Sequence, residues 1–127
     1  MPRLFLDSTV IISAITARNP AAVYLLMDDD FERYTNEYVI KETRRILQKA
    51  FDFSIRDVND SIDLVRRQCI VLPLPNKEEY KKLEIKDASD KPIVLSAIKK
   101  RCILVTEDYI LLENAKKYVK AKRPENL

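Results

Sequence analysis

Two short apolar runs of this chain lead directly to an aspartate. Residues 4–6 end at Asp7, and residues 102–105 are followed within three positions by Asp108. Strands of an open parallel sheet are covered on both faces, so they read as unbroken apolar runs, and ligands bind beyond their carboxyl ends. We therefore expect both aspartates in one functional crevice. Because the chain has no histidine, the pattern favours carboxylates that hold a hard cation such as Mg²⁺ or Mn²⁺.

Short apolar runs alternate with helical patterns along the chain. The runs predict strands at residues 3–6, 31–35, 69–72, 102–106 and 118–122. Helices are expected at residues 10–15, 20–27, 37–50, 54–66, 77–84, 90–100 and 109–115. This order predicts an α/β fold with three layers, in which a mostly parallel sheet of about five strands carries helices on both faces.

Length and composition indicate one globular domain over residues 1–127, with 46% hydrophobic and 34% charged residues. No apolar run approaches the ~20 residues of a membrane span, and the start lacks the long apolar stretch of a signal peptide, so we expect a cytoplasmic protein. Cys69 and Cys102 each open an apolar run, which favours buried, reduced thiols. Their spacing does not fit a zinc site.

The complete absence of glycine excludes function classes. Phosphate-binding loops of the Walker and dinucleotide types need glycine for close backbone approach, so an NTPase or a nicotinamide enzyme is not expected. The formal net charge of +3 favours a polyanionic partner only weakly.

Each acidic residue also has a purely structural interpretation. Asp87 and Asp90 flank a predicted helix start, where one of them would serve as the N-cap. Asp108 could cap the helix at 109–115. Glu42 lies just off an apolar helical stripe and could pair with a neighbouring arginine on the helix surface. Asp7 is harder to explain in this way, because a carboxylate after an apolar run is costly to desolvate unless a cation meets it.

Taken in order, four segments resemble the motifs of the PIN-domain nucleases, in particular the small single-domain toxins of the VapC-like kind. The first is an apolar strand that ends at Asp7, followed by a hydroxyl residue and an apolar helix. The second places Glu42 in a helix. The third places Asp90 at a helix start with Ala97 seven residues later, and the fourth ends an apolar strand in Thr, any residue and Asp108.

The resemblance extends over the whole chain with two departures. The glycine that commonly precedes the fourth strand is replaced in the stretch 99–101, and Ile110 stands where a further acid is often found. The second departure bears on the binding of one metal ion if two are used. Asp87 matches an additional aspartate of one branch of the family and is expected to be auxiliary to Asp90.

The resemblance implies a PIN-like fold and a metal-dependent ribonuclease, with RNA as substrate and an antitoxin as a possible protein partner. Asp7, Glu42, Asp90 and Asp108 would share one pocket and bind one or two Mg²⁺ or Mn²⁺ ions. These ions would activate a water molecule to attack a phosphodiester and neutralise charge on the phosphate. Crowding of the carboxylates should raise the pKa of at least one in the absence of metal.

Further residues are candidates for supporting roles. Ser8 and Thr106 could orient a carboxylate or water, although hydroxyls at strand ends often only cap helices. Contacts to the RNA backbone are expected from Arg45, Lys86 and Lys91, with solvated helix faces as the alternative.

Two other function classes stay open at this stage. One is a PIN-like module that binds RNA or protein without cutting; the presence of all the principal acids argues against it. The other is an aspartyl-phosphate phosphatase beginning at Asp7, but that chemistry normally needs a second aspartate where Thr9 stands. We also expect a homodimer through a self-complementary contact of the first two helices. Its apolar residues would be Val10, Ile11, Ile12, Ile15, Val23, Leu26 and Met27.

Overall fold

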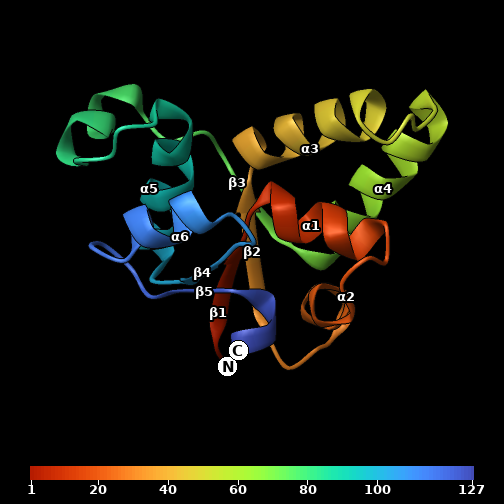
Figure 1. The fold of residues 1–127 in the computed structure, drawn as a ribbon, viewed down its shortest axis with the longest axis horizontal. Helices are drawn as coiled ribbons and strands as arrows, with labels where there is room; N and C mark the ends of the chain where they lie inside the picture. Colours follow the sequence, from red (N-terminus) through yellow and green to blue (C-terminus); the bar gives the residue numbers. More distant parts are fainter.

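A computed structural model describes all residues 1–127, and its centre is one sheet of five strands (Figure 1). The strands lie in the order β3–β2–β1–β4–β5, and every neighbouring pair is parallel. The expected sheet is therefore confirmed, and it is parallel throughout. The strands are β1 (Arg3–Leu6), β2 (Glu32–Asn36), β3 (Ile70–Leu72), β4 (Ile103–Val105) and β5 (Ala121–Lys122).

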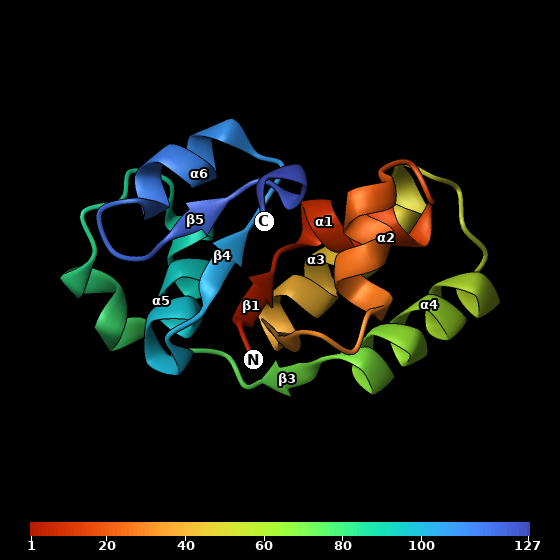
Figure 2. The same ribbon diagram turned by 90° about the horizontal axis from the view of Figure 1, so that it is seen from below.

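Helices cover both faces of this sheet, as predicted. The α-helices are α1 (Ser8–Ile15), α2 (Pro20–Met27), α3 (Glu37–Lys49), α4 (Ile55–Gln68), α5 (Lys91–Lys100) and α6 (Tyr109–Ala115). Figures 1 and 2 show α1, α2 and α4 on one side of the sheet and α5 and α6 on the other. Right-handed crossovers require this arrangement, because the chain runs outward from β1 to β3 and then returns past β1 to β4 and β5.

Side-chain caps explain where several helices begin. Asp7, Asn19, Asn36 and Ser54 each precede a helix and accept a hydrogen bond from a backbone N–H of its first turn. Three short 3₁₀ helices complete the chain: η1 (Lys77–Lys82), η2 (Ala88–Asp90) and η3 (Pro124–Asn126).

Three expected elements differ in detail. The helix expected at 77–84 is the 3₁₀ helix η1, which has no fully buried residue and packs only Tyr80 against the core, too little apolar surface to hold a longer α-helix in place. The last strand is reduced to Ala121–Lys122. Asp90 lies just before α5 instead of inside it.

The core forms around β1 and the helices beside it. Leu4, Phe5 and Leu6 are completely buried, as the unbroken apolar run predicted. Cys69 and Cys102 are free and buried, and burial raises the pKa of their thiols to about 12 and about 11, so both stay protonated at neutral pH. The expectation of inert, reduced cysteines is borne out.

Burial also corrects the reasoning behind the predicted dimer. Val10, Ile11, Ile12 and Leu26 face the core, and none is more than 4% exposed. The sequence pattern overestimated the apolar surface that α1 and α2 leave uncovered, because these two helices also pack against each other and against α3 and α4.

No single helix is long and apolar enough to cross a membrane. Only the sharply bent pair α1 and α2, taken together, has the length and composition of a membrane span.

The strand order reverses at β1, which has β2 on one side and β4 on the other. At such a switch point the connections leave the sheet in opposite directions and open a crevice beyond the carboxyl ends of the two central strands. Asp7 follows β1, and Thr106 follows β4, so the topology brings both to this crevice.

Candidate metal centre

Asp7 directly follows the carboxyl end of β1 and is only 2% exposed. Its Oδ1 accepts hydrogen bonds from the Thr9 hydroxyl (2.6 Å) and the Val10 N–H (3.2 Å), and its Oδ2 accepts one from the Thr106 hydroxyl (2.5 Å). Burial raises the pKa of the carboxyl to about 6 although these hydrogen bonds oppose the shift, and the nearby Glu42 carboxylate adds a smaller increase.

Thr106 links the ends of the two central strands. It is fully buried, donates to Asp7, and its Oγ1 accepts the backbone N–H of Asp108 at 3.0 Å. One hydroxyl therefore fixes the position of both aspartates that follow the strands. The expected supporting role of Thr106 thus has a structural counterpart in these two hydrogen bonds.

Glu42 projects from α3 toward the start of α1. The Ser8 hydroxyl donates to Glu42 Oε1 at 2.5 Å, across 34 positions of sequence. The alternative interpretation, a surface ion pair, does not hold, because Glu42 forms no salt bridge with any basic side chain. The neighbouring Arg44 donates instead to Asn59 at 2.7 Å. Ser8 thus joins α1 to the acid of α3.

Asp87 and Asp90 take different roles. Asp87 is exposed and caps η2, accepting from the backbone N–H and hydroxyl of Ser89, which lowers the pKa of its carboxyl. Asp90 is 7% exposed and makes no capping hydrogen bond to α5. Burial raises the pKa of Asp90 to about 6, and repulsion from Asp87, Asp108 and Glu42 acts in the same direction. Asp87 therefore serves as a helix cap, whereas Asp90 is a buried carboxyl that caps no helix.

Asp108 caps α6, as the structural interpretation allowed. Its Oδ1 accepts from the Ile110 N–H at 2.9 Å and the Leu111 N–H at 3.3 Å. Its side chain is exposed to solvent, and it raises the pKa of Asp90. Capping occupies one carboxylate oxygen, so the role of Asp108 as a cap does not exclude a second interaction.

The electrostatics of the site fit a cation. None of the four principal acids forms an ion pair, and their mutual repulsion together with burial keeps two of them hard to ionise. No three acidic or thiol side chains are arranged to hold one ion directly. Mg²⁺ commonly retains several waters and uses one or two carboxylates, so the donor set fits a hydrated hard cation and not a closed protein cage.

The raised pKa values agree with the sequence-based expectation, but the main cause differs. For both Asp7 and Asp90 burial is the largest contribution, and repulsion between carboxylates is secondary. Sequence spacing predicted the crowding; it could not show how deeply each carboxyl is buried.

Two cavities adjoin the acids. One of about 820 Å³ runs along α3 and is lined by Glu42 and Arg45 among others. The second, of about 330 Å³, is lined by Ser8 and Asp108 and by Arg18, whose guanidinium lies 4.8 Å from the Phe51 ring centre. Of the basic residues expected to contact RNA, only Arg45 lines either cavity. Lys86 is exposed and Lys91 half-buried, and neither faces these spaces.

The sequence reasoning missed three residues of the site. Thr9 donates to Asp7 and accepts the Glu107 N–H at 2.9 Å, so it connects α1 to the end of β4. Tyr38 lies one turn before Glu42, whose carboxylate together with burial raises the pKa of the phenol. The side chain of Asn114 on α6 lowers the pKa of Asp90. Only Thr9 had a sequence signal, since hydroxyls directly after a strand-end aspartate are well placed to bond it.

Solved structures share the fold at low sequence identity. VapBC2 from Rickettsia felis, bound to a DNA fragment from its promoter, has 15% identity and a TM-score of 0.72 over 95% of this chain and 98% of that chain. VapBC-1 from nontypeable Haemophilus influenzae has 16% identity and a TM-score of 0.70 over 97% and 98%. FitAcB from Neisseria gonorrhoeae has 20% identity and a TM-score of 0.66 over 98% and 99%.

These structures establish the likeness of the fold. No curated protein matches the chain in sequence. A family model described as the PIN domain matches residues 3–109, which span β1, the helix of Glu42, Asp90 and the strand before Asp108. Because this match extends over most of its length, the chain belongs to the PIN domain family.

Proposed function

We propose that this PIN-domain protein is a metal-dependent endoribonuclease in which Asp7, Glu42, Asp90 and Asp108 hold one or two Mg²⁺ or Mn²⁺ ions. The observation that carries the proposal is that these acids come from separate segments, form no ion pair and act on one another's pKa, with two of them buried and protonated more readily than usual. Such a site is destabilised by its own charge until a cation enters.

The residues of the proposed site have different roles. A bound cation lowers the pKa of a water molecule and neutralises charge on the phosphate. Thr106 and Thr9 hold the Asp7 carboxylate in one orientation through its two oxygens, and Ser8 does the same for Glu42. Asp87 is auxiliary, because its carboxylate is occupied by Ser89.

We further propose that the protein is the toxin of a toxin–antitoxin pair and acts on cytoplasmic RNA as a homodimer. Support comes from the family and from structural neighbours that are described as VapBC and FitAB complexes. A second protein would then control access to the crevice.

The test combines metal binding with cleavage. Wild-type protein and the variant Asp7→Asn are melted with EDTA or with Mn²⁺, and each is incubated with structured and unstructured RNAs. Mn²⁺ should raise the melting temperature of the wild type and start cleavage, and Asp7→Asn should lose both responses. Asp63→Asn, at an exposed position of α4, is the matched control and should behave as the wild type.

The alternative function, RNA or protein binding without cleavage, makes a different prediction. If Mn²⁺ stabilises the wild type but no RNA is cut, the binding module is favoured. If Asp7→Asn cuts RNA as well as the wild type, the nuclease site is wrongly assigned.

A further inference from the structure

One acid beside the proposed metal site is not among its proposed ligands. Glu107 lies between Thr106 and the principal acid Asp108, and it lines the cavity of about 330 Å³ together with Asp108. It forms no ion pair. This position allows two roles, a further metal ligand or a residue that holds the loop after β4 in place.

The carboxylate of Glu107 is bound by two side chains from a distant part of the sequence. Ser13, which is buried in α1, donates its hydroxyl to Oε1 at 2.6 Å, and Asn19 donates its amide to Oε2 at 2.8 Å. The Oδ1 of Asn19 accepts the Ala21 N–H at 3.0 Å and thereby caps α2. Each carboxylate oxygen therefore has a donor whose own position is fixed by a helix.

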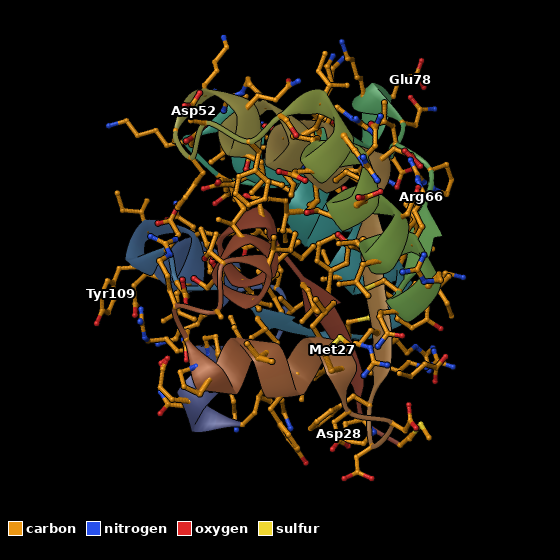
Figure 3. The ribbon with its side chains drawn as sticks, turned by 90° about the vertical axis from the view of Figure 1, so that its right-hand side faces the viewer. Met27, Asp28, Asp52, Arg66, Glu78 and Tyr109 are labelled. Carbon is orange, nitrogen blue, oxygen red and sulfur yellow. The ribbon has the colours of Figure 1, made fainter.

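The backbone of Glu107 is held as well. Its N–H donates to the Thr9 hydroxyl at 2.9 Å, and its carbonyl accepts from Arg123 Nη1 at 2.9 Å. Arg123 precedes η3, and its guanidinium lies 4.8 Å from the ring centre of Tyr109, which Figure 3 labels. Figure 2 shows the end of β4, α1 and η3 beside one another. Hydrogen bonds from both sides of this junction therefore meet at one residue.

We propose that Glu107 is a positioning residue of the metal site. Its bonds to Ser13 and Asn19 fix the loop that carries Thr106 and Asp108, and its carboxylate does not bind the metal. Both of its oxygens already accept a hydrogen bond from the protein, and such bonds to an ionised carboxylate are strong. Asp108 differs, because only its Oδ1 is used in capping. The inference rests on the proposed function, since it concerns the loop that carries one of the proposed ligands.

The hydrogen bond between Asn19 and Glu107 can be reversed without a change in net charge. In Asn19→Asp the donor is lost and two carboxylates face each other, although aspartate still caps α2. In the double variant Asn19→Asp/Glu107→Gln, the glutamine amide donates to the new carboxylate and its oxygen accepts from Ser13. The double variant therefore keeps the charge and the hydrogen bonds of the wild type, with one donor and one acceptor exchanged.

Amide hydrogen exchange measures the loop in the absence of metal. The N–H groups of Glu107 and Asp108 each donate to a threonine hydroxyl, so their exchange reports how firmly the loop is held. In EDTA at pH 7, Asn19→Asp should speed the exchange of both by at least about 10-fold relative to the amides of β1, which corresponds to the loss of one hydrogen bond to a charged group. The double variant should restore the exchange rates of the wild type.

Two further variants complete this measurement. Ser13→Ala removes the other donor without adding charge, so it should speed the exchange of the same two amides even if Asn19→Asp does not fold. Asn76→Asp makes the same substitution at the exposed cap of η1 and should leave the loop unchanged. Circular dichroism of each variant checks that it is folded.

Titration calorimetry with Mn²⁺ separates positioning from the effect of charge. Asn19→Asp adds a negative charge near the site, so charge alone would tighten Mn²⁺ binding. Displacement of Thr106 and Asp108 would weaken it instead, by at least about 10-fold, and the double variant should regain the affinity of the wild type. If Glu107 were a ligand, the double variant would lose affinity, because an amide replaces the carboxylate.

The outcomes distinguish this inference from the proposed function. A wild type that binds no Mn²⁺ overturns the metal site, and amide exchange then still decides whether Glu107 holds the loop. The positioning role is overturned if both amides keep their wild-type exchange in Asn19→Asp and Ser13→Ala, or if exchange in β1 rises equally, which would indicate general destabilisation. It is also overturned if the double variant leaves the exchange fast, or if Asn19→Asp binds Mn²⁺ as tightly as the wild type or more tightly. Wild-type exchange with weakened Mn²⁺ binding in the double variant would make Glu107 a ligand.

Discussion

Asp7 shows how one residue can weaken the fold in order to serve the site. Its folded pKa of about 6 exceeds the ordinary 3.8, so the native state binds a proton that the unfolded chain has already released. Stability without metal is therefore highest at low pH and falls as pH rises from about 4 through 6, by about 3 kcal/mol for this group alone. Asp90 acts in the same direction and the same pH range.

We predict that the metal-free protein is less stable at pH 7.5 than at pH 5. Asp7→Asn should reduce this difference and stabilise the metal-free fold at pH 7.5, because the amide oxygen still accepts from Val10 and no charge is buried. Urea denaturation in EDTA at both pH values measures this. A wild type that gains stability between pH 5 and 7.5 would contradict the burial of an ionisable Asp7.

Asp90 and Asp87 allow a sharper comparison. Asp90→Asn should reduce Mn²⁺ affinity strongly, because it removes the buried carboxyl that makes no capping bond. Asp87→Asn should have a small effect, because asparagine also caps helices and this carboxylate is held by Ser89. Titration calorimetry with Mn²⁺ measures both. The assignment of principal and auxiliary acid is reversed if Asp87→Asn does the greater damage.

The sequence predicted the principal acids more successfully than the side chains that hold these acids in place. Order and spacing singled out Asp7 and Glu42, since motif positions are local. The partner of Glu42 is Ser8, 34 positions away, and Asp7 is held by Thr106, 99 positions away. Such contacts depend on how the sheet places β1 beside β4, so local pattern could name the hydroxyls but not their partners.

Among the elements, α3 carries Glu42 and α5 directly follows Asp90, and a buried side chain joins these two helices. Asn36 is fully buried; its Oδ1 caps α3 at Val39, and its Nδ2 donates to the Pro92 carbonyl (3.1 Å) and to Ser96 Oγ (2.9 Å) in α5. The amide therefore fixes the start of the helix of Glu42 relative to the helix that follows Asp90.

Asn36→Asp should uncouple the two helices. The carboxylate can still cap α3 but cannot donate to Pro92, so we expect a loss of at least about 1–3 kcal/mol in unfolding free energy and weaker Mn²⁺ binding. Urea denaturation and calorimetry measure the two effects. Asn76→Asp changes an exposed cap of η1 in the same way and serves as the control, with little expected change.

Element boundaries followed from the sequence wherever a cap or an apolar stripe marked them. The predicted boundaries were wrong where neither a cap nor an apolar stripe was present, as at η1 and at the short β5. The end of α5 shows a further limit: Arg101 adopts a left-handed conformation with φ of 55°, at the point where the resemblance led us to expect glycine. A chain without glycine must place other residues in such positions, at a cost that composition alone does not locate.

For the whole molecule, burial limits the apolar surface that is left for a partner. Burial of most of the α1 and α2 residues leaves Ile15, Val23 and Met27 around an apolar cavity of about 390 Å³ that Leu64 of α4 also lines. Met27 is 46% exposed, and Figure 3 looks onto this face. A dimer through the first helices would have to be centred here, on a smaller contact than the sequence suggested.

We predict that the chain forms a homodimer at tens of micromolar protein, with a mass by light scattering of twice 14.8 kDa. In a two-fold contact every substitution faces its own copy, so Met27→Glu would place two like charges together, next to the aspartates at 28–30, and should give a folded monomer. Ile110→Glu, at a 70% exposed position of α6 on the other side of the sheet, should leave the mass unchanged. A monomeric wild type would remove the dimer from the proposal, and a dimer that survives Met27→Glu would move the contact to another face. Neither outcome would affect the crevice, because its acids all come from one chain.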